Sequence, residues 1–228
     1  MPLTASAAGQ ATAPHHRHTW TVTATIEVFA DINCPFTHVG LKVVAGEINA
    51  SDTPVELRVR AWPLEWVNGA PLDVDDVARK VAALSSQLGI ADFDGFRPDT
   101  WPDTTIPALN LADAAYQRDA ATGFAVSVRL RSMLFEEGRD IADEHVLAEV
   151  ADSFALPRPG LEPAAGVEAD YTEGQRRGVR GSPDFWAEGR EFFCPSLNIG
   201  HEADGSLTAA FDDGGIRELV RSLQTPPG

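Results

Sequence analysis

Apolar and polar positions alternate in two early segments of the chain and recur at helical spacing between them. Residues 21–32 are rich in Thr, Val and Ile, and residues 55–61, VELRVRA, alternate apolar with charged side chains, so both are predicted to be strands. Residues 35–49 carry apolar side chains at the spacing of one helix face. The chain therefore opens as strand, helix, strand, as an α/β domain does.

The middle of the chain carries mainly helical patterns. Asp73 is a suitable N-cap for a helix that ends at Gly89, and Pro107 fits the first turn of another that ends before Gly123. Further helices are expected over residues 124–137, 142–154 and 162–177. Residues 91–104, which hold clusters of Gly, Pro and Asp, are expected to form a loop.

Strand signal returns near the C-terminus. Residues 183–187 and 191–194 are apolar and aromatic, and Glu188-Gly189-Arg190 between them predicts a hairpin. Residues 213–223 have the pattern of a closing helix. The whole order is strand–helix–strand, a helical insertion, and strand–strand–helix, with no internal repeat and no flexible linker between domains.

Charge and hydropathy exclude several classes of function. The net charge of −16 disfavours binding to nucleic acid or to an anionic membrane surface. No apolar run approaches the roughly 20 residues of a membrane span. Lysine occurs only at Lys42 and Lys80, and Ala, Asp, Gly and Arg are abundant, which is typical of a G+C-rich bacterial genome.

The first 20 residues and the cysteine content bear on location. Residues 1–20 are small and polar and have no apolar segment typical of a secretion signal, so they are expected to form a disordered tail. Three histidines in it are read as part of a flexible surface tract and not as a metal site. There are only two cysteines, Cys34 and Cys194, and a structural disulfide is a poor expectation without an export signal. A reduced, cytoplasmic protein is predicted.

Cys34 lies where the first strand gives way to the first helix, in the sequence ADINCPFTHVG. The start of a helix presents unpaired N–H groups and the positive end of the dipole, and Pro35 suits the first turn. Both features favour the thiolate, the reactive form of cysteine. Thr37, one turn on, is placed to point a hydroxyl at the sulfur, and His38 offers either a positive charge or a solvated helix side chain.

Four features resemble the thioredoxin superfamily, and its DsbA-like branch in particular. They are the Cys34-Pro35-Phe36-Thr37 junction at the place of the Cys-x-x-Cys motif, the helical stretch after it, the sequence GVRGSPDFW, and the closing hairpin and helix. The resemblance spans about residues 25–223. It implies an α/β, thioredoxin-like fold with a helical domain inserted between the second and third strands. The boundaries follow as residues 21–66 and 178–224 for the thioredoxin-like domain and 67–177 for the insertion.

The chain departs from the redox members of this branch at Thr37, which stands where they keep the second cysteine. Kappa-class glutathione transferases and 2-hydroxychromene-2-carboxylate isomerases in the same branch also lack the pair, but have serine at the first position, where this chain keeps Cys34. The resemblance implies that Ser182 precedes a cis Pro183 and that the backbone of Ser182 pairs with a bound thiol peptide.

The remaining candidate site residues are the arginines that precede Ser182 and the second cysteine. Arg180 is expected to bind the carboxylates of a small thiol, whereas Arg176 and Arg177 are expected to cap the preceding helix. Cys194 is expected in the core. In the sheet order of the family it lies two strands from Cys34, about 10 Å at ~4.8 Å per strand and beyond the roughly 7 Å limit of a disulfide.

These observations predict a monothiol, DsbA-like oxidoreductase or thiol transferase in which Cys34 and Thr37 are catalytic. Substrate would be bound by Pro35, Phe36, His38, Arg180, Ser182 and Pro183. No metal and no tightly bound cofactor are expected. The expected partners are a small thiol cosubstrate, such as glutathione or mycothiol, and an unidentified electrophile or disulfide. The alternative is a non-catalytic protein of the same fold that binds a ligand or peptide.

Overall fold

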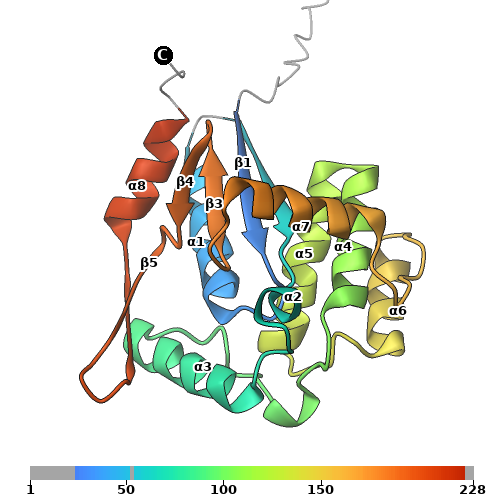
Figure 1. Cartoon of the computed structure of the whole chain (residues 1–228), viewed down its shortest axis with the longest axis horizontal. Coiled ribbons are helices and arrows are strands. Elements are labelled where there is room, and N and C mark those ends of the chain that lie inside the picture. The colour runs from blue at the N-terminus through green and yellow to red at the C-terminus, as the bar shows by residue number, and fades with distance from the viewer. Residues whose placement is uncertain (1–23, 52–53, 224–228) are drawn as a thin grey trace, which may run out of the picture.

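A four-stranded mixed sheet forms the centre of the molecule (Figure 1), in a computed structural model that describes residues 24–51 and 54–223. Its order is β2-β1-β3-β4, with β1 (Ala24–Ala30), β2 (Val55–Ala61), β3 (Asp184–Ala187) and β4 (Arg190–Phe193). β1 and β2 run parallel, whereas β3 is antiparallel to both β1 and β4. The mixed α/β fold and the strand–helix–strand opening are as predicted.

Helices follow the predicted order around this sheet. α1 (Pro35–Ala50) joins β1 to β2, and α8 (Asp213–Ser222) closes the described chain. Between β2 and β3 lie α2 (Leu64–Asn68), α3 (Val74–Leu88), the 3-10 turn η1 (Pro98–Thr100), α4 (Ile106–Arg118), α5 (Ala120–Phe135), α6 (Glu144–Ser153) and α7 (Ala165–Arg177). The predicted tail, residues 1–20, lies outside the described residues. Among the described helices, none has the length and apolar character needed to cross a bilayer.

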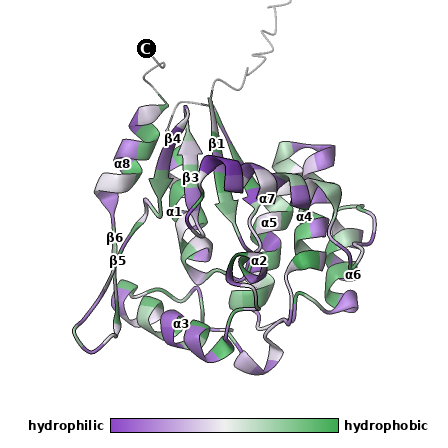
Figure 2. Ribbon diagram, in the orientation of Figure 1, coloured by the Kyte–Doolittle hydropathy of each residue, from purple (hydrophilic) through white to green (hydrophobic). Residues whose placement is uncertain are grey.

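The sheet is covered on both faces. On one face, Ile26 and Val28 of β1 pack in a buried cluster with Leu41 of α1 and Leu219 of α8. On the other, Phe29 packs in the cluster that α7 covers, and α7 passes across the front of the sheet in Figure 1. Figure 2 shows the resulting contrast between apolar strands and the polar residues of α7. The alternation of β1 thus buries both of its faces.

Ion pairs hold α7 on the sheet. Arg60 of β2 donates to Glu27 of β1 and to Asp170 of α7, each at 2.5 Å, and Arg177 donates to Glu27 at 2.5 Å. Burial raises the pKa of Glu27, but the hydrogen bonds from Arg177 and Arg60 outweigh it and leave that pKa below its ordinary value. Arg177 and its neighbour Arg176 both pair with Glu173. Both arginines lie in the last turn of α7, where they were expected, and their guanidinium groups also bond to the Glu173 carboxylate.

The predicted helix boundary at Gly123 is wrong. The break between α4 and α5 falls at Asp119, whose carboxylate accepts a hydrogen bond from the Thr122 N–H at 2.7 Å and so begins α5. Gly123, which was expected to end a helix, lies inside α5. A Cβ on it would come within 2.2 Å of the Tyr116 ring. Glycine is present there because two helices approach closely, and not because a helix ends.

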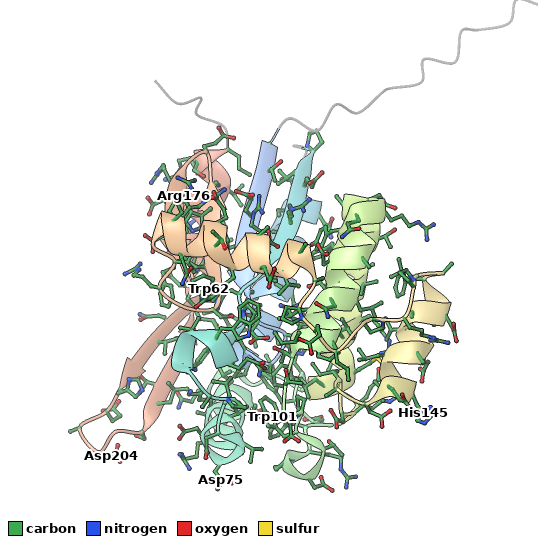
Figure 3. All side chains as sticks on the ribbon, turned by 45° about the vertical axis from the view of Figure 1, so that its right-hand side comes forward. Trp62, Asp75, Trp101, His145, Arg176 and Asp204 are labelled. Atoms are coloured by element: carbon green, nitrogen blue, oxygen red, sulfur yellow. The ribbon has the colours of Figure 1, made fainter. Side chains whose placement is uncertain are left out.

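A second hairpin, β5 (Leu197–His201) and β6 (Leu207–Phe211), was not predicted. It packs on α3, where the Gln87 amide donates to the Leu207 carbonyl and accepts from the Ala209 N–H, both at 2.7 Å. Figure 3 shows Asp204 in its turn and Asp75 at the start of α3 at one end of the molecule, far from the interior Trp62. Gly200 interrupts the alternating pattern that could have indicated β5.

Asp184 places a carboxyl group inside the sheet. It is fully buried; its Oδ2 accepts from the Arg180 N–H at 3.2 Å, and its Oδ1 has no partner among the described residues. Burial raises the pKa of Asp184 to about 6, and the negative charge of Glu191 acts in the same direction. A carboxylate at this position is therefore a cost to the folded state at neutral pH.

We predict that Asp184→Asn removes this cost. A raised pKa stabilises the fold below the unfolded value near pH 4, and that stabilisation is lost as pH rises through about 6. Each pKa unit corresponds to about 1.4 kcal/mol, so the wild type should lose roughly 2–3 kcal/mol over this range through Asp184. Urea unfolding should show the variant to be more stable at pH 8 and nearly equal at pH 3.5.

The matched control is Asp75→Asn, which changes an exposed carboxylate at the start of α3. It should leave the difference between pH 3.5 and pH 8 as in the wild type. If Asp184→Asn and the wild type lose stability equally between these two pH values, Asp184 does not hold its proton in the folded protein.

Candidate functional site

A cavity of about 700 Å³ opens beside the start of α1. Its walls come from the start of α1, from α2 and α3, from the loop before β3, from the turn between β4 and β5, and from the start of α8. The residues that line it include Cys34, Pro35, Phe36, Ser182 and Cys194. Elements from both ends of the chain thus meet at the predicted nucleophile.

Cys34 is the N-cap residue of α1, with Pro35 in the first turn as predicted. Its side chain makes no capping hydrogen bond to the helix. The sulfur instead donates to the main-chain carbonyl of Ser182 at 3.0 Å. Cys34 is only 3% exposed, although it stands at a strand–helix junction, and it lines the cavity.

Thr37 is fully buried behind Cys34. Its hydroxyl lies 2.8 Å from the hydroxyl of Ser182, at hydrogen-bond distance. The sequence predicted that this hydroxyl points at the sulfur, but the structure pairs it with Ser182. One residue, Ser182, therefore holds both side chains of the motif. The Ser182 carbonyl bonds to the Cys34 thiol, and the Ser182 hydroxyl bonds to the Thr37 hydroxyl.

The loop before β3 brings Ser182 to this place. The Ser182–Pro183 bond is cis, and the Ser182 hydroxyl also accepts from the Asp31 N–H at 3.0 Å. α1 approaches this loop at Gly40, where a Cβ would lie 2.9 Å from the Ser196 hydroxyl and 3.7 Å from the Pro183 ring. A Cβ at this helix position would therefore crowd Ser196, in the turn between β4 and β5, and would make only ordinary contact with Pro183.

Asp31, which sequence reasoning did not single out, binds the loops around Cys34 together. Its carboxylate accepts from the N–H of Leu64 at 2.6 Å and from that of Ile32 at 2.7 Å. Its main-chain carbonyl accepts from Arg131 at 3.0 Å. The acidic residue Asp31 within the apolar run VFADI was the signal that could have indicated a buried carboxylate.

Asp31 and Arg131 form a buried pair of opposite charges. Complete burial raises the pKa of Asp31 to about 6, against the hydrogen bonds from Leu64 and Ile32 and the charge of Arg131. Burial also lowers the pKa of Arg131 to about 10, and the negative charges of Asp31 and, more weakly, Cys34 oppose that change. Arg131 therefore stays a cation at neutral pH, close enough to Cys34 for their charges to interact.

His38 does not take the part predicted for it. It is 2% exposed, packs against Phe93 and Phe135, and does not line the cavity. Burial lowers the pKa of His38 to about 4, and the nearby Lys42 ammonium adds to this effect. The histidine is therefore neutral at physiological pH, and neither a positive charge beside Cys34 nor a solvated side chain.

His38 does belong to a cluster with metal-ligand types of side chain. One ligand atom each from His38, Asp92 and Glu136 lie within 4.8 Å of one another. The ammonium of Lys42 bonds to both carboxylates. The Lys42 cation thus offsets one of the two negative charges of the cluster, and His38 lies at hydrogen-bond distance, 3.2 Å, from the Asp92 carbonyl.

Arg180 lies outside the cavity wall. Its guanidinium pairs with Glu191 at 2.6 Å and stands over the Phe193 ring, 5.0 Å from the centroid. Phe193 itself lines the cavity, and so does Gly181, which follows Arg180. The predicted binding of substrate carboxylates by Arg180 would require it to leave Glu191, so this role stays a prediction.

Cys194 lines the same cavity as Cys34. It follows β4, two strands from β1 as expected, and its backbone takes a φ of 47°, which is unusual for a residue other than glycine. Burial raises the pKa of Cys194 to about 12, and the charge of Cys34 acts in the same direction. Both cysteines are free, and Cys194 is a neutral thiol at physiological pH.

Comparisons with known proteins place this arrangement in a family. The DSBA-like thioredoxin domain matches residues 25–200. No curated protein sequence matches the chain. Among solved structures, a protein from Streptomyces coelicolor described as a probable DsbA oxidoreductase is similar over 90% of this chain and 93% of its own, with 20% identity and a TM-score of 0.60.

Two further structures share the fold at low identity. A 2-hydroxychromene-2-carboxylate isomerase matches 74% of this chain and 88% of its own, with 16% identity and a TM-score of 0.55. The cytosolic disulfide reductase DsbM from Pseudomonas aeruginosa matches 88% and 98%, with 19% identity and a TM-score of 0.50. With three quarters of the sequence matched by the family and a thiol at the start of α1, the chain belongs to the DsbA-like thioredoxin domain family.

Proposed function

We propose that the protein is a thiol enzyme in which Cys34 acts as a single nucleophile. Its reaction would be thiol exchange or transfer with a small thiol cosubstrate, such as glutathione or mycothiol. The observation that carries the proposal is the placement of Cys34 at the N-terminus of α1, facing a cavity, with Thr37 bonded to Ser182 where a second thiol would stand. The cytosolic DsbM and the two free cysteines support a cytoplasmic location.

In this proposal, each group around the sulfur of Cys34 has a role. To react, the S–H of Cys34 must give up its proton and its hydrogen bond to the Ser182 carbonyl. The anion then faces the first turn of α1, whose N–H groups have no partner within the helix. The positive charge of the buried Arg131 attracts the Cys34 thiolate. Thr37 fixes Ser182 and takes no part in bond making.

An exchange reaction then needs two steps. The Cys34 thiolate attacks one sulfur of a disulfide, the S–S bond breaks, and the other half leaves as a thiolate. Cys34 is left in a mixed disulfide. A molecule of the small thiol then attacks the sulfur that is bonded to Cys34. Cys34 leaves as the thiolate, and the small thiol departs in a disulfide with the half that Cys34 had held. The second step needs an external thiol because no cysteine follows Cys34 by one helical turn.

A non-catalytic binding protein is the second candidate. The observation in its favour is that Cys34 is only 3% exposed and that its proton is held by a carbonyl. Such a protein would present the cavity and the Ser182 loop to a ligand without reacting. Reactivity of the thiol separates the two candidates.

We predict that Cys34 is alkylated much faster than Cys194. The pKa of Cys194 is raised to about 12, so this thiol is almost wholly protonated at pH 7. Iodoacetamide should therefore modify Cys34 at least about 100 times as fast as Cys194, because the thiolate is the reacting form. Peptide mapping at timed intervals gives both rates, with Cys34→Ser and Cys194→Ser as controls. Equal rates, or a faster Cys194, would favour the binding protein.

A second prediction concerns Thr37. Thr37→Cys should place a thiol one turn after Cys34, beside the same Ser182, and should allow an internal disulfide to form. The oxidised variant should then reactivate reduced, denatured ribonuclease at least about ten times as fast as the wild type, because it carries an internal disulfide that it can pass to the substrate. The matched control is Thr37→Ser, which keeps the hydroxyl and should behave as the wild type.

Two results would count against the proposed site. Equal reactivation by the wild type and by Thr37→Cys would mean that Thr37 does not limit the chemistry. A folded Thr37→Cys protein that forms no internal disulfide would mean that the junction lacks the geometry of a dithiol site.

A further inference from the structure

The cavity beside Cys34 has mostly apolar walls. Apolar side chains line it from α1 and α2, from α3 and the segment before it, and from β4 and β5: Phe36, Leu64, Leu72, Val77, Phe193 and Ile199 among them. At about 700 Å³ it falls within the roughly 300–1,000 Å³ of small-molecule sites. Gly181 and Ser182 belong to the same wall as Cys34, so a ligand in the cavity lies beside the sulfur.

One basic residue, Lys80 of α3, stands among these walls. It is half-buried, and it forms no ion pair or hydrogen bond with a described residue. Its neighbour Arg79 is exposed and pairs with Asp76. In a chain with a net charge of −16, a half-buried lysine without a counter-ion is unusual.

The acidic residues of the same cavity are already engaged. Asp212 caps α8 by accepting from the Gly215 N–H at 2.9 Å, and Glu218 accepts from Arg190 at 2.7 Å. Among the described residues that line the cavity, Lys80 is therefore the charged side chain that has neither a hydrogen-bond partner nor an ion-pair partner. The hydrogen bonds of Gln87 to β6 hold α3, and with it Lys80, against the hairpin that forms the opposite wall.

We propose that the cavity binds a small organic anion with an apolar body, and that Lys80 binds its carboxylate or sulfonate group. The inference rests on the proposed function, since it names the class of molecule brought to Cys34. An anion with an apolar body satisfies both features at once, because the walls bury the body and the charge replaces the counter-ion that Lys80 lacks. The acidic protein repels anions at long range, so a dedicated cation is needed.

The test measures binding without chemistry. In the Cys34→Ala background, the probes are 8-anilinonaphthalene-1-sulfonate, which is anionic, and N-phenyl-1-naphthylamine, which has nearly the same body and no charge. Lys80→Met should lower the affinity for the anionic probe about tenfold, as expected for the loss of one charged hydrogen bond, and should leave the affinity for the neutral probe nearly unchanged. Arg79→Met, with its guanidinium in the neighbouring ion pair, is the matched control and should change neither.

A second variant locates the probes. Asn68→Trp changes an exposed residue at the rim of the cavity. The larger side chain should narrow the entrance and lower the affinity for both probes. The proposal is overturned if Lys80→Met affects both probes alike or neither, or if Asn68→Trp leaves both unchanged, which would place the probes elsewhere. Because these measurements lack Cys34, they stand or fall separately from its reactivity.

Discussion

The buried carboxylate of Asp31 is the constraint on which the site depends. Its side chain holds the N–H groups of Ile32 and Leu64, its own N–H holds Ser182, and its carbonyl holds Arg131 of α5. Four segments that are distant in the sequence therefore meet at one residue, three positions before Cys34. Charged groups are rarely buried without such partners, since desolvation would otherwise exceed the gain.

The same network explains how a single thiol is held. The Ser182 hydroxyl accepts a hydrogen bond from the Asp31 N–H and shares one with the Thr37 hydroxyl, and the Ser182 carbonyl accepts one from the Cys34 thiol. A hydroxyl at Thr37 keeps this loop in place but cannot form a disulfide. The cavity then offers Cys34 to molecules small enough to enter, while burial keeps the second thiol, Cys194, protonated.

Local signals in the sequence predicted the sheet, most helices and the motif at Cys34, because each depends on short-range pattern: β-branched residues in β1, Asp73 and Gly89 at the ends of α3, Pro35 in the first turn of α1. The cavity could not be predicted in this way. It depends on the β5–β6 hairpin packing on α3, which brings Ile199 opposite Lys80 across about 120 residues of sequence. The surroundings of Cys34 and His38 likewise come from distant parts of the sequence, the Ser182 loop for Cys34 and Phe93 and Phe135 for His38, which local periodicity does not indicate.

If Cys34 is the one working thiol of the protein, as proposed, it should form mixed disulfides with small thiols. The intact mass of the protein purified without reductant, followed by peptide mapping, tests this directly. We expect an adduct with the mass of a small cellular thiol on the peptide that contains Cys34, removed by reductant, with Cys194 unmodified. An adduct confined to Cys194, or a protein that remains unmodified even after incubation with oxidised glutathione, would contradict it.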